Sequence, residues 1–412
     1  MKPENPLNQI LYGPPGTGKT YHTINKAIEI IENRVVSDNE KREDLKAKFD
    51  KYKNDGQIEF VTFHQSYGYE EFVEGIKADL ESDDVKYKLE EGVFKKLCEK
   101  ATRKQFFYIG QKIAKYEVIS NSVELLKLKR ENGTIIPIPM YLIMEVFTLI
   151  SNSIITPEDL NNKTAINKMS ETTEKYIING YPNIFRDLAQ YYLEYKDANL
   201  NDKNYILIID EINRGNISKI FGELITLIEP SKRIGEEEEI FLKLSNSPEP
   251  FGVPSNLYII GTMNTADRSI AQIDTALRRR FEFVEMMPKV ELFDNIFIDG
   301  IDIKEMIIAI NERIEYIYDR EHTIGHSYFL PLVDTPTKDK LDEIFSVNII
   351  PLLAEYFYGD WADIISILNN DFIKEKELKY KPKNIHVENK VYEVNDTFTL
   401  EQYKKIYAGD SE

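Results

Sequence analysis

The sequence predicts an α/β fold with a parallel sheet, a domain-sized insertion and a helical region toward the C-terminus. Segments typical of the strands of such a sheet occur at residues 10–12, 58–63, 205–209, 257–262 and 281–284. Apolar residues at helical spacing follow the first strand and dominate after Pro288, with long helices expected at residues 303–318 and 340–358. Residues 102–203 interrupt the alternation of strands and helices, so we expect them to form an inserted α+β subdomain.

Shorter elements and boundaries follow from the same patterns. Helices are expected at residues 70–76, 141–150, 181–194, 217–228 and 274–280, and a hairpin followed by a helix at residues 77–101. Within the insertion, strands are expected at residues 116–128 and 135–138, on either side of a turn signal at residues 130–134. The predicted parts are a first core segment (1–101), the insertion (102–203), a second core segment (204–287) and a helical lid with a C-terminal segment (288–412).

Composition narrows the functional classes. The chain has 412 residues and a net charge of −18, so it does not attract nucleic acid by its overall charge. The single cysteine, Cys98, excludes an internal disulfide and is expected to pack in a core. No run of about 18 apolar residues is present, and the first residues lack the apolar stretch of a signal peptide. We therefore expect a cytoplasmic protein that does not enter a membrane.

A glycine-rich loop is the strongest motif. It fits G-x-x-x-x-G-K-[ST] and lies between a predicted strand and a predicted helix, which is the context of a phosphate-binding loop. Glycines let backbone N–H groups approach a triphosphate, and the following helix directs its positive end at the anion. The lysine would contact the β- and γ-phosphates, and the threonine hydroxyl would hold Mg²⁺. The candidate nucleotide-binding residues are Gly13, Pro14, Pro15, Gly16, Thr17, Gly18, Lys19 and Thr20.

Polar residues at two other strand ends complete the predicted site. Asp210 and Glu211 follow five apolar residues, so Asp210 is expected to anchor Mg²⁺ and Glu211 to deprotonate the attacking water. Asn264 ends the next strand and could hydrogen-bond both the γ-phosphate and the water. A turn asparagine is the simpler alternative, because asparagine is common after strands.

Three consecutive arginines, Arg278, Arg279 and Arg280, close the short helix predicted at residues 274–280. They cannot all share one helix face, and one of them could simply stabilise the C-terminal end of the helix. Alternatively, one is an arginine finger that reaches the nucleotide of a neighbouring subunit, which requires a ring.

The order of these motifs resembles that of AAA+ NTPases, and several longer strings resemble the McrB subgroup, the motor subunits of McrBC-type modification-dependent restriction systems. The strings lie at residues 63–67, 210–219, 221–224, 263–269, 276–281, 324–329 and 355–361. The resemblance covers about residues 8–100 and 204–370. It implies an αβα AAA+ core with a helical lid. It also implies that the subunits form a ring, expected to be a hexamer, and that nucleotide binds between neighbouring subunits.

The resemblance also implies roles that spacing does not show. It favours GTP over ATP as substrate, assigns the finger to Arg279 or Arg280, and assigns the loop at residues 263–269 to hydrolysis. It implies that His326 contacts the nucleotide from the lid, although a packing role at a helix start is an equal alternative. The implied partner is an McrC-like subunit that stimulates turnover and carries the nuclease, with DNA engaged through the complex.

Two departures from the subgroup bear on specificity. The phosphate loop begins close to residue 1, so we expect the DNA-reading domain often fused there to be missing, and residues 102–203 form an extra block. Residues 103–140 carry seven basic and three acidic side chains, which suits DNA contact, docking of a partner subunit or simply a solvated β-face. The basic residues are Arg103, Lys104, Lys112, Lys115, Lys127, Lys129 and Arg130, and Phe106, Phe107, Tyr108 and Tyr116 lie nearby.

Other functional classes remain open from the sequence. A MoxR-like remodelling chaperone would have a related core but protein clients, and the long McrB-like strings argue against it. A nucleotide-gated switch with little turnover would not need Glu211.

Overall fold

The computed structural model describes residues 5–37, 39–79, 86–102, 107, 110–121, 125–170, 173–195, 203–247, 250–267, 275–369, 372–380 and 390–408. The chain divides into two compact units. Unit 1 comprises Met1–Cys98 and Asn204–Glu412, and unit 2 comprises Glu99–Lys203. The tip of the predicted hairpin at residues 81–84, together with Arg103, Lys104, Phe106, Tyr108 and residues 268–274, lies outside the described residues.

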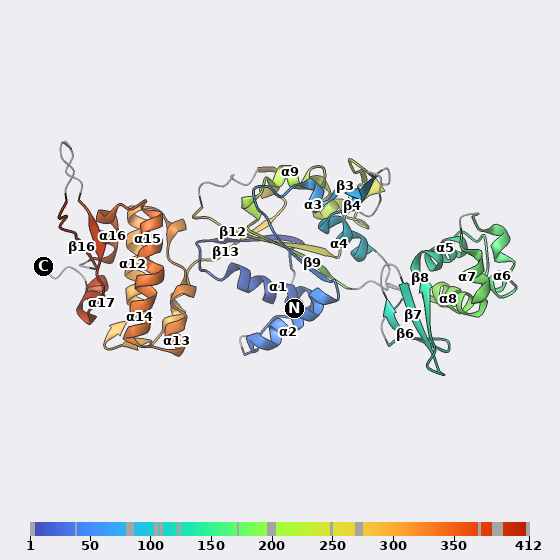
Figure 1. The fold of residues 1–412 in the computed structure, drawn as a ribbon, viewed down its shortest axis with the longest axis horizontal. Coiled ribbons are helices and arrows are strands. Elements are labelled where there is room, and N and C mark those ends of the chain that lie inside the picture. The colour runs from blue at the N-terminus through green and yellow to red at the C-terminus, as the bar shows by residue number, and fades with distance from the viewer. Residues whose placement is uncertain are drawn as a thin grey trace. The chain divides into compact units, whose positions relative to one another are not determined.

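A five-stranded parallel sheet forms the centre of unit 1 (Figure 1). Its strand order is β13-β1-β12-β9-β2. The strands are β1 (Asn8–Gly13), β2 (Ile58–Thr62), β9 (Tyr205–Asp210), β12 (Leu257–Asn264) and β13 (Glu282–Glu285). All five predicted strands are therefore present in one sheet. The α/β fold of a P-loop NTPase, with helices on both faces of a parallel sheet, is confirmed.

Helices cover both faces of this sheet, which explains why the central strands are apolar throughout. Helices α1 (Lys19–Glu32) and α2 (Arg42–Asn54) pack on one face, where Ile206 and Ile208 join the same core cluster as Ile28 and Phe49. The other face carries α3 (Tyr69–Phe72), α4 (Val93–Thr102) and α9 (Ile217–Phe221). Cys98 is 1% exposed, as expected for a core residue.

Two predicted helices are wrong in part. The helix expected at residues 70–76 ends at Phe72, and the chain continues as β3 (Glu74–Asp79), paired with β4 (Lys86–Glu91). Tertiary contacts decide this, because the buried Glu74 carboxylate pairs with Lys95 at 2.8 Å and accepts from the backbone of Asn246 at 2.9 Å.

The helix expected at residues 217–228 is also interrupted. It ends at Phe221 and resumes as α10 (Leu224–Leu227). Gly222 has φ 50° and ψ −128°, a backbone conformation that side chains disfavour, so the helix cannot pass through it. The other short elements between β9 and β13 are two helices, η2 (Ile212–Arg214) and α11 (Thr275–Arg278). The same stretch also contains η3 (Pro230–Lys232), β10 (Leu242–Lys243) and β11 (Pro250–Phe251).

The C-terminal part of unit 1 is a mainly helical lid with its own core. Its long helix α12 (Ile303–Ile317) begins where the Asp302 side chain accepts a hydrogen bond from the backbone of Glu305. The long helix expected at residues 340–358 is α14 (Lys338–Ile344) and α15 (Ile350–Tyr356), joined by a π-helical turn at Phe345–Ile349. Pro351, near the start of α15, lacks an N–H and so removes one i→i−4 hydrogen bond there.

The other lid elements are short. They are η4 (Val290–Phe293), β14 (Phe297–Ile298), β15 (Ile301–Asp302), η5 (Arg320–His322), η6 (His326–Tyr328), α13 (Pro331–Asp334), α16 (Trp361–Leu368), β16 (Ile373–Glu375), β17 (Tyr392–Val394) and α17 (Leu400–Tyr407). Across the described ranges of both units, every helix is too short or too polar to cross a bilayer.

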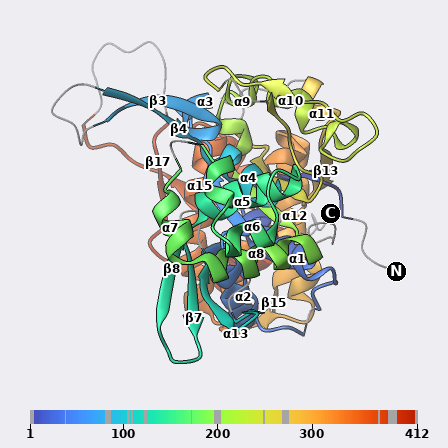
Figure 2. The ribbon, with the colours of Figure 1, turned by 90° about the vertical axis from the view of Figure 1, so that its right-hand side faces the viewer.

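Unit 2 combines a four-stranded antiparallel sheet with a small helical cluster. Its strands are β5 (Lys112–Ile113), β6 (Tyr116–Asn121), β7 (Leu125–Arg130) and β8 (Ile135–Pro139), in that order. Its helices are α5 (Met140–Ser151), α6 (Pro157–Asn161), η1 (Ala165–Lys168), α7 (Lys175–Gly180) and α8 (Pro182–Tyr195). Strand β7 and its neighbours extend beyond the helices in both views (Figures 1 and 2). Alternate residues of β7, Leu126 and Leu128, are buried against the helices, so Lys127 and Lys129 lie on the open face.

Candidate nucleotide-binding and hydrolysis site

The glycine-rich loop joins β1 to α1 directly. Gly16 and Gly18 have φ values of 77° and 75°, so the loop uses the left-handed conformations that glycine allows. The Lys19 ammonium donates to the carbonyls of Gly13 at 2.9 Å and Pro14 at 2.7 Å. Burial lowers the pKa of Lys19 to about 8, although Glu211 and Asp210 nearby oppose this shift. Lys19 is thus held at the centre of the loop, where a phosphate could replace the two carbonyls.

Hydroxyl and carboxylate oxygens meet beside the loop. Thr20 Oγ1 donates to Asp210 Oδ1 at 3.0 Å, and Thr262 Oγ1 donates to the same oxygen at 2.7 Å. Thr262 Oγ1 also accepts from the backbone N–H of Glu211 at 3.1 Å. Hard oxygen donors of this kind suit Mg²⁺, which commonly takes one or two protein ligands and completes its shell with water and phosphate. Thr20 and Asp210 therefore fit the metal role predicted for them.

Glu211 and Asn264 lie in direct contact. Asn264 Nδ2 donates to Glu211 Oε1, and Arg214 Nε donates to Glu211 Oε2 at 3.3 Å. Glu211 has φ 52°, a left-handed conformation that costs on the order of 1 kcal/mol for a residue with a side chain. Burial is the main cause that raises the pKa of Glu211, while Arg214 opposes it. A carboxylate held in a strained turn between two donors is a suitable general base.

The lid contacts the phosphate loop through backbone atoms. Ser327 N donates to Gly16 O at 2.9 Å. A Cβ at Gly325 would lie 2.1 Å from the backbone of Gly16, so only glycine permits this approach. Gly16 and Ser327 line a cavity of about 280 Å³ together with Lys19 and Glu211.

His326 is buried next to the same loop. Its Nδ1 accepts from the backbone N–H of Lys289 at 3.2 Å, so in the neutral ring Nε2 carries the proton. This Nε2 would lie 3.7 Å from a Cβ placed on Gly18. Burial, with Lys289 and His22 nearby, lowers the pKa of His326 to about 4. His326 therefore presents a neutral donor toward the loop, a geometry that fits nucleotide contact as well as packing.

Comparison with known proteins agrees with this arrangement. Residues 302–365 match the model of the McrB alpha-helical lid domain, and residues 140–281 match that of the AAA domain of the dynein-related subfamily. The EcoKMcrB subunit of the type IV methyl-directed restriction enzyme of Escherichia coli (strain K12) is 42% identical over 175 residues. The chain is an McrB-like AAA+ P-loop NTPase.

The similarity is partial in extent. The match to the E. coli subunit covers 39% of this McrB-like chain and 38% of that relative. The BsuMI component YdiS of a type II restriction enzyme of Bacillus subtilis (strain 168) is 38% identical over 95 residues, which cover 20% of this chain and 27% of the relative. The McrB-like chain thus spans well under half the length of either relative in these matches.

The three arginines of the McrB-like chain have different surroundings. Arg280 forms an ion pair with Glu229 at 2.5 Å, and its side chain is 6% exposed. Arg278 lies over the Phe283 ring, 5.3 Å from its centroid. Arg279 is exposed. Of the two predicted finger residues, the structure therefore favours Arg279, because Arg280 is engaged within its own subunit.

Sequence reasoning did not single out two residues that contact the site. Thr262 precedes Asn264 by two positions in β12, and the period of two in a strand places both on one face, so this signal was available. Arg214 pairs with Glu211 and lies 3.9 Å from Asp267, through a turn that no local pattern predicts.

Proposed function

We propose that this chain is the NTP-hydrolysing ring subunit of an McrBC-like DNA restriction or phage-defence complex. The observation that carries the proposal is the single hydrogen-bonded group formed by Thr20, Asp210, Thr262, Glu211 and Asn264 beside the phosphate loop. It joins the residues proposed to hold Mg²⁺ with the residues proposed to activate water.

Each residue has a distinct role in hydrolysis. Lys19 leaves the loop carbonyls to neutralise the β- and γ-phosphates, and the loop N–H groups orient the triphosphate. Thr20 and Asp210 would hold Mg²⁺, which would supply neutralisation of phosphate charge. Glu211 accepts the proton of the attacking water, and Asn264 orients Glu211 and the water.

The proposed complex follows from the resemblance and the relatives' names. GTP is the favoured substrate because of the resemblance to McrB subunits. ATP is the alternative, because the phosphate loop does not contact the base and so does not distinguish the two nucleotides. Subunits assemble into a ring, proposed as a hexamer in the cytoplasm, with Arg279 completing the neighbouring site. An McrC-like subunit stimulates turnover and cleaves the DNA along which the complex moves.

Hydrolysis of GTP and ATP, measured side by side with and without a candidate McrC-like nuclease and DNA, tests this function. We expect turnover that Lys19→Ala abolishes, a particle mass several times that of the 48.1 kDa chain, and stimulation by the nuclease subunit. Nucleotide-dependent turnover without stimulation by any nuclease, but with remodelling of a protein client, would instead indicate a MoxR-like chaperone. Absence of turnover under all conditions would refute the enzymatic role.

A further inference from the structure

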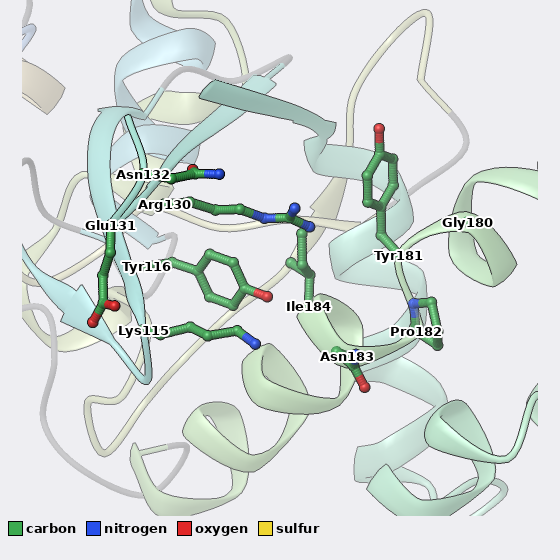
Figure 3. A pocket seen from close by; sticks show the side chains of 10 residues that line it. All are labelled: Lys115, Tyr116, Arg130, Glu131, Asn132, Gly180, Tyr181, Pro182, Asn183 and Ile184. Atoms are coloured by element: carbon green, nitrogen blue, oxygen red, sulfur yellow. The ribbon is translucent and has the colours of Figure 1, made fainter. Parts of the chain in front are cut away.

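Unit 2 contains a pocket that the hydrolysis site does not use. It has a volume of about 440 Å³ and lies between the β6–β7 sheet and the start of α8. Figure 3 shows Lys115, Tyr116 and Arg130 extending side by side from the sheet, with their polar ends toward the helix. Tyr181 and Ile184 close the opposite side. The volume falls within the range of about 300–1,000 Å³ that small-molecule sites occupy.

The pocket is electropositive. Arg130 Nε is buried, and no hydrogen-bond partner lies within reach of it. Among the residues that the structure describes, neither Lys115 nor Arg130 forms an ion pair with a carboxylate. Glu131 also lines the pocket, but Figure 3 shows its carboxylate turned away from the Arg130 guanidinium. The nearby Asp187 forms its ion pair with Arg186, at 2.7 Å, rather than with either cation of the pocket.

The start of α8 adds to this field. The helix runs for 14 residues from Pro182, and its positive end faces the pocket. Pro182 has no N–H, and the N–H of Asn183 lies in the first turn, where the helix supplies no acceptor. A guanidinium, an ammonium and a helix start converging on one space is the donor set of a phosphate site.

We propose that this pocket binds a phosphate group carried by a nucleotide, either free or within a DNA strand. Lys115, Arg130 and the start of α8 take the phosphate, while the exposed ring of Tyr181 provides a flat surface for the base or sugar. All residues that line this pocket belong to unit 2, and the proposal does not depend on the function proposed for unit 1.

The test uses the full chain with Lys19→Ala, so that the phosphate loop does not contribute. Binding of a fluorescein-labelled single-stranded oligodeoxynucleotide is measured by anisotropy, with deoxynucleoside monophosphate and inorganic phosphate as competitors. Lys115→Gln and Arg130→Gln are each expected to weaken binding about tenfold or more, as the loss of a charge-assisted hydrogen bond does. Lys115 is exposed, so Lys115→Gln leaves the fold intact. It therefore tests the pocket even where Arg130→Gln disturbs the fold.

Two exposed lysines of the same sheet provide matched controls. Lys112→Gln and Lys127→Gln remove the same charge outside the pocket and are expected to change binding by about twofold or less. Competition by monophosphate supports a site for a free nucleotide, and binding of the oligonucleotide alone supports a site for a strand. Equal weakening by all four variants would show diffuse attraction and overturn the proposal. Absence of binding, or binding that neither Lys115→Gln nor Arg130→Gln weakens, would also overturn it.

Discussion

Nucleotide affinity should depend on pH through Lys19. Lys19 is 6% exposed, and burial lowers its pKa to about 8 in the free protein. Only the charged form neutralises the β- and γ-phosphates, so raising the pH through 8 converts the binding form into one that lacks the charge.

The size of the effect follows from this pKa. When only the protonated lysine binds, the apparent dissociation constant is multiplied by 1 + 10^(pH − pKa). With a pKa of about 8, this factor is about 1.1 at pH 7, about 2 at pH 8 and about 11 at pH 9. Affinity is therefore expected to fall about tenfold between pH 7 and pH 9.

A titration of the Mg²⁺-free protein with a fluorescent guanine nucleotide between pH 6.5 and 9.5 measures this fall. The neighbouring Glu211 carboxylate favours the charged lysine, so Glu211→Gln should move the midpoint to lower pH. Glu305→Gln, on the exposed side of the lid helix α12, is the control and should leave the midpoint unchanged. Constant affinity from pH 7 to pH 9, or a midpoint that Glu211→Gln moves upward, would refute this reasoning.

Five further substitutions test single residues. Glu211→Gln should retain nucleotide but hydrolyse it about 10²–10⁴-fold more slowly, because the general base is lost; single-turnover hydrolysis measures this. Arg279→Ala should assemble normally but lose turnover, whereas Arg280→Ala should lower the midpoint of thermal unfolding, because it removes the ion pair with Glu229. His326→Ala should weaken nucleotide affinity by a factor that stays constant from pH 6 to pH 8, since the ring is neutral throughout. Gly325→Ala should lower both nucleotide affinity and thermal stability, because the added Cβ meets the phosphate loop.

Controls separate these outcomes from general damage. Glu305→Gln, on the exposed side of α12, should change neither nucleotide affinity nor thermal stability. Mixing Arg279→Ala with Glu211→Gln should restore some turnover at mixed interfaces; rings shown by mass to be mixed, yet inactive at every ratio, would exclude an arginine acting between subunits. Wild-type affinity in His326→Ala would leave that residue a packing role. Near-normal turnover in Glu211→Gln would remove it from catalysis.

Much of the site is local in sequence and was therefore predictable. The strand, loop and helix around Lys19 lie within one short segment, and Asp210 and Glu211 directly follow an apolar run. The order of the strands in the sheet was not predicted. The carboxyl ends of parallel strands share one edge of the sheet, however, so the strand assignments alone were enough to place Asn264 near Glu211.

What could not be predicted depends on distant partners. Glu74 lies in a strand rather than a helix because Lys95 and the backbone of Asn246 bind its carboxylate. Whether Arg279 or Arg280 is free depended on Glu229, which is far from both in sequence. The pocket of unit 2 joins Arg130 to the start of α8 across the intervening helices, so no sequence pattern predicts it.

Arg233 has a consequence for subunit contacts. It is fully buried, and its guanidinium donates to the carbonyls of Ile228, Pro254 and Leu257 and to Asn8 Oδ1 at 2.7 Å. The Asn8 amide in turn donates to the carbonyl of Arg280 at 3.0 Å.

The residue next to the exposed Arg279 is therefore tied to the first strand of the sheet through an interior amide. In the proposed ring, the position of Arg279 relative to the neighbouring site would depend on these hydrogen bonds in the interior of its own subunit. A substitution at Asn8, although this residue is buried, would then change the cooperativity of hydrolysis between subunits more than the nucleotide affinity of an individual subunit.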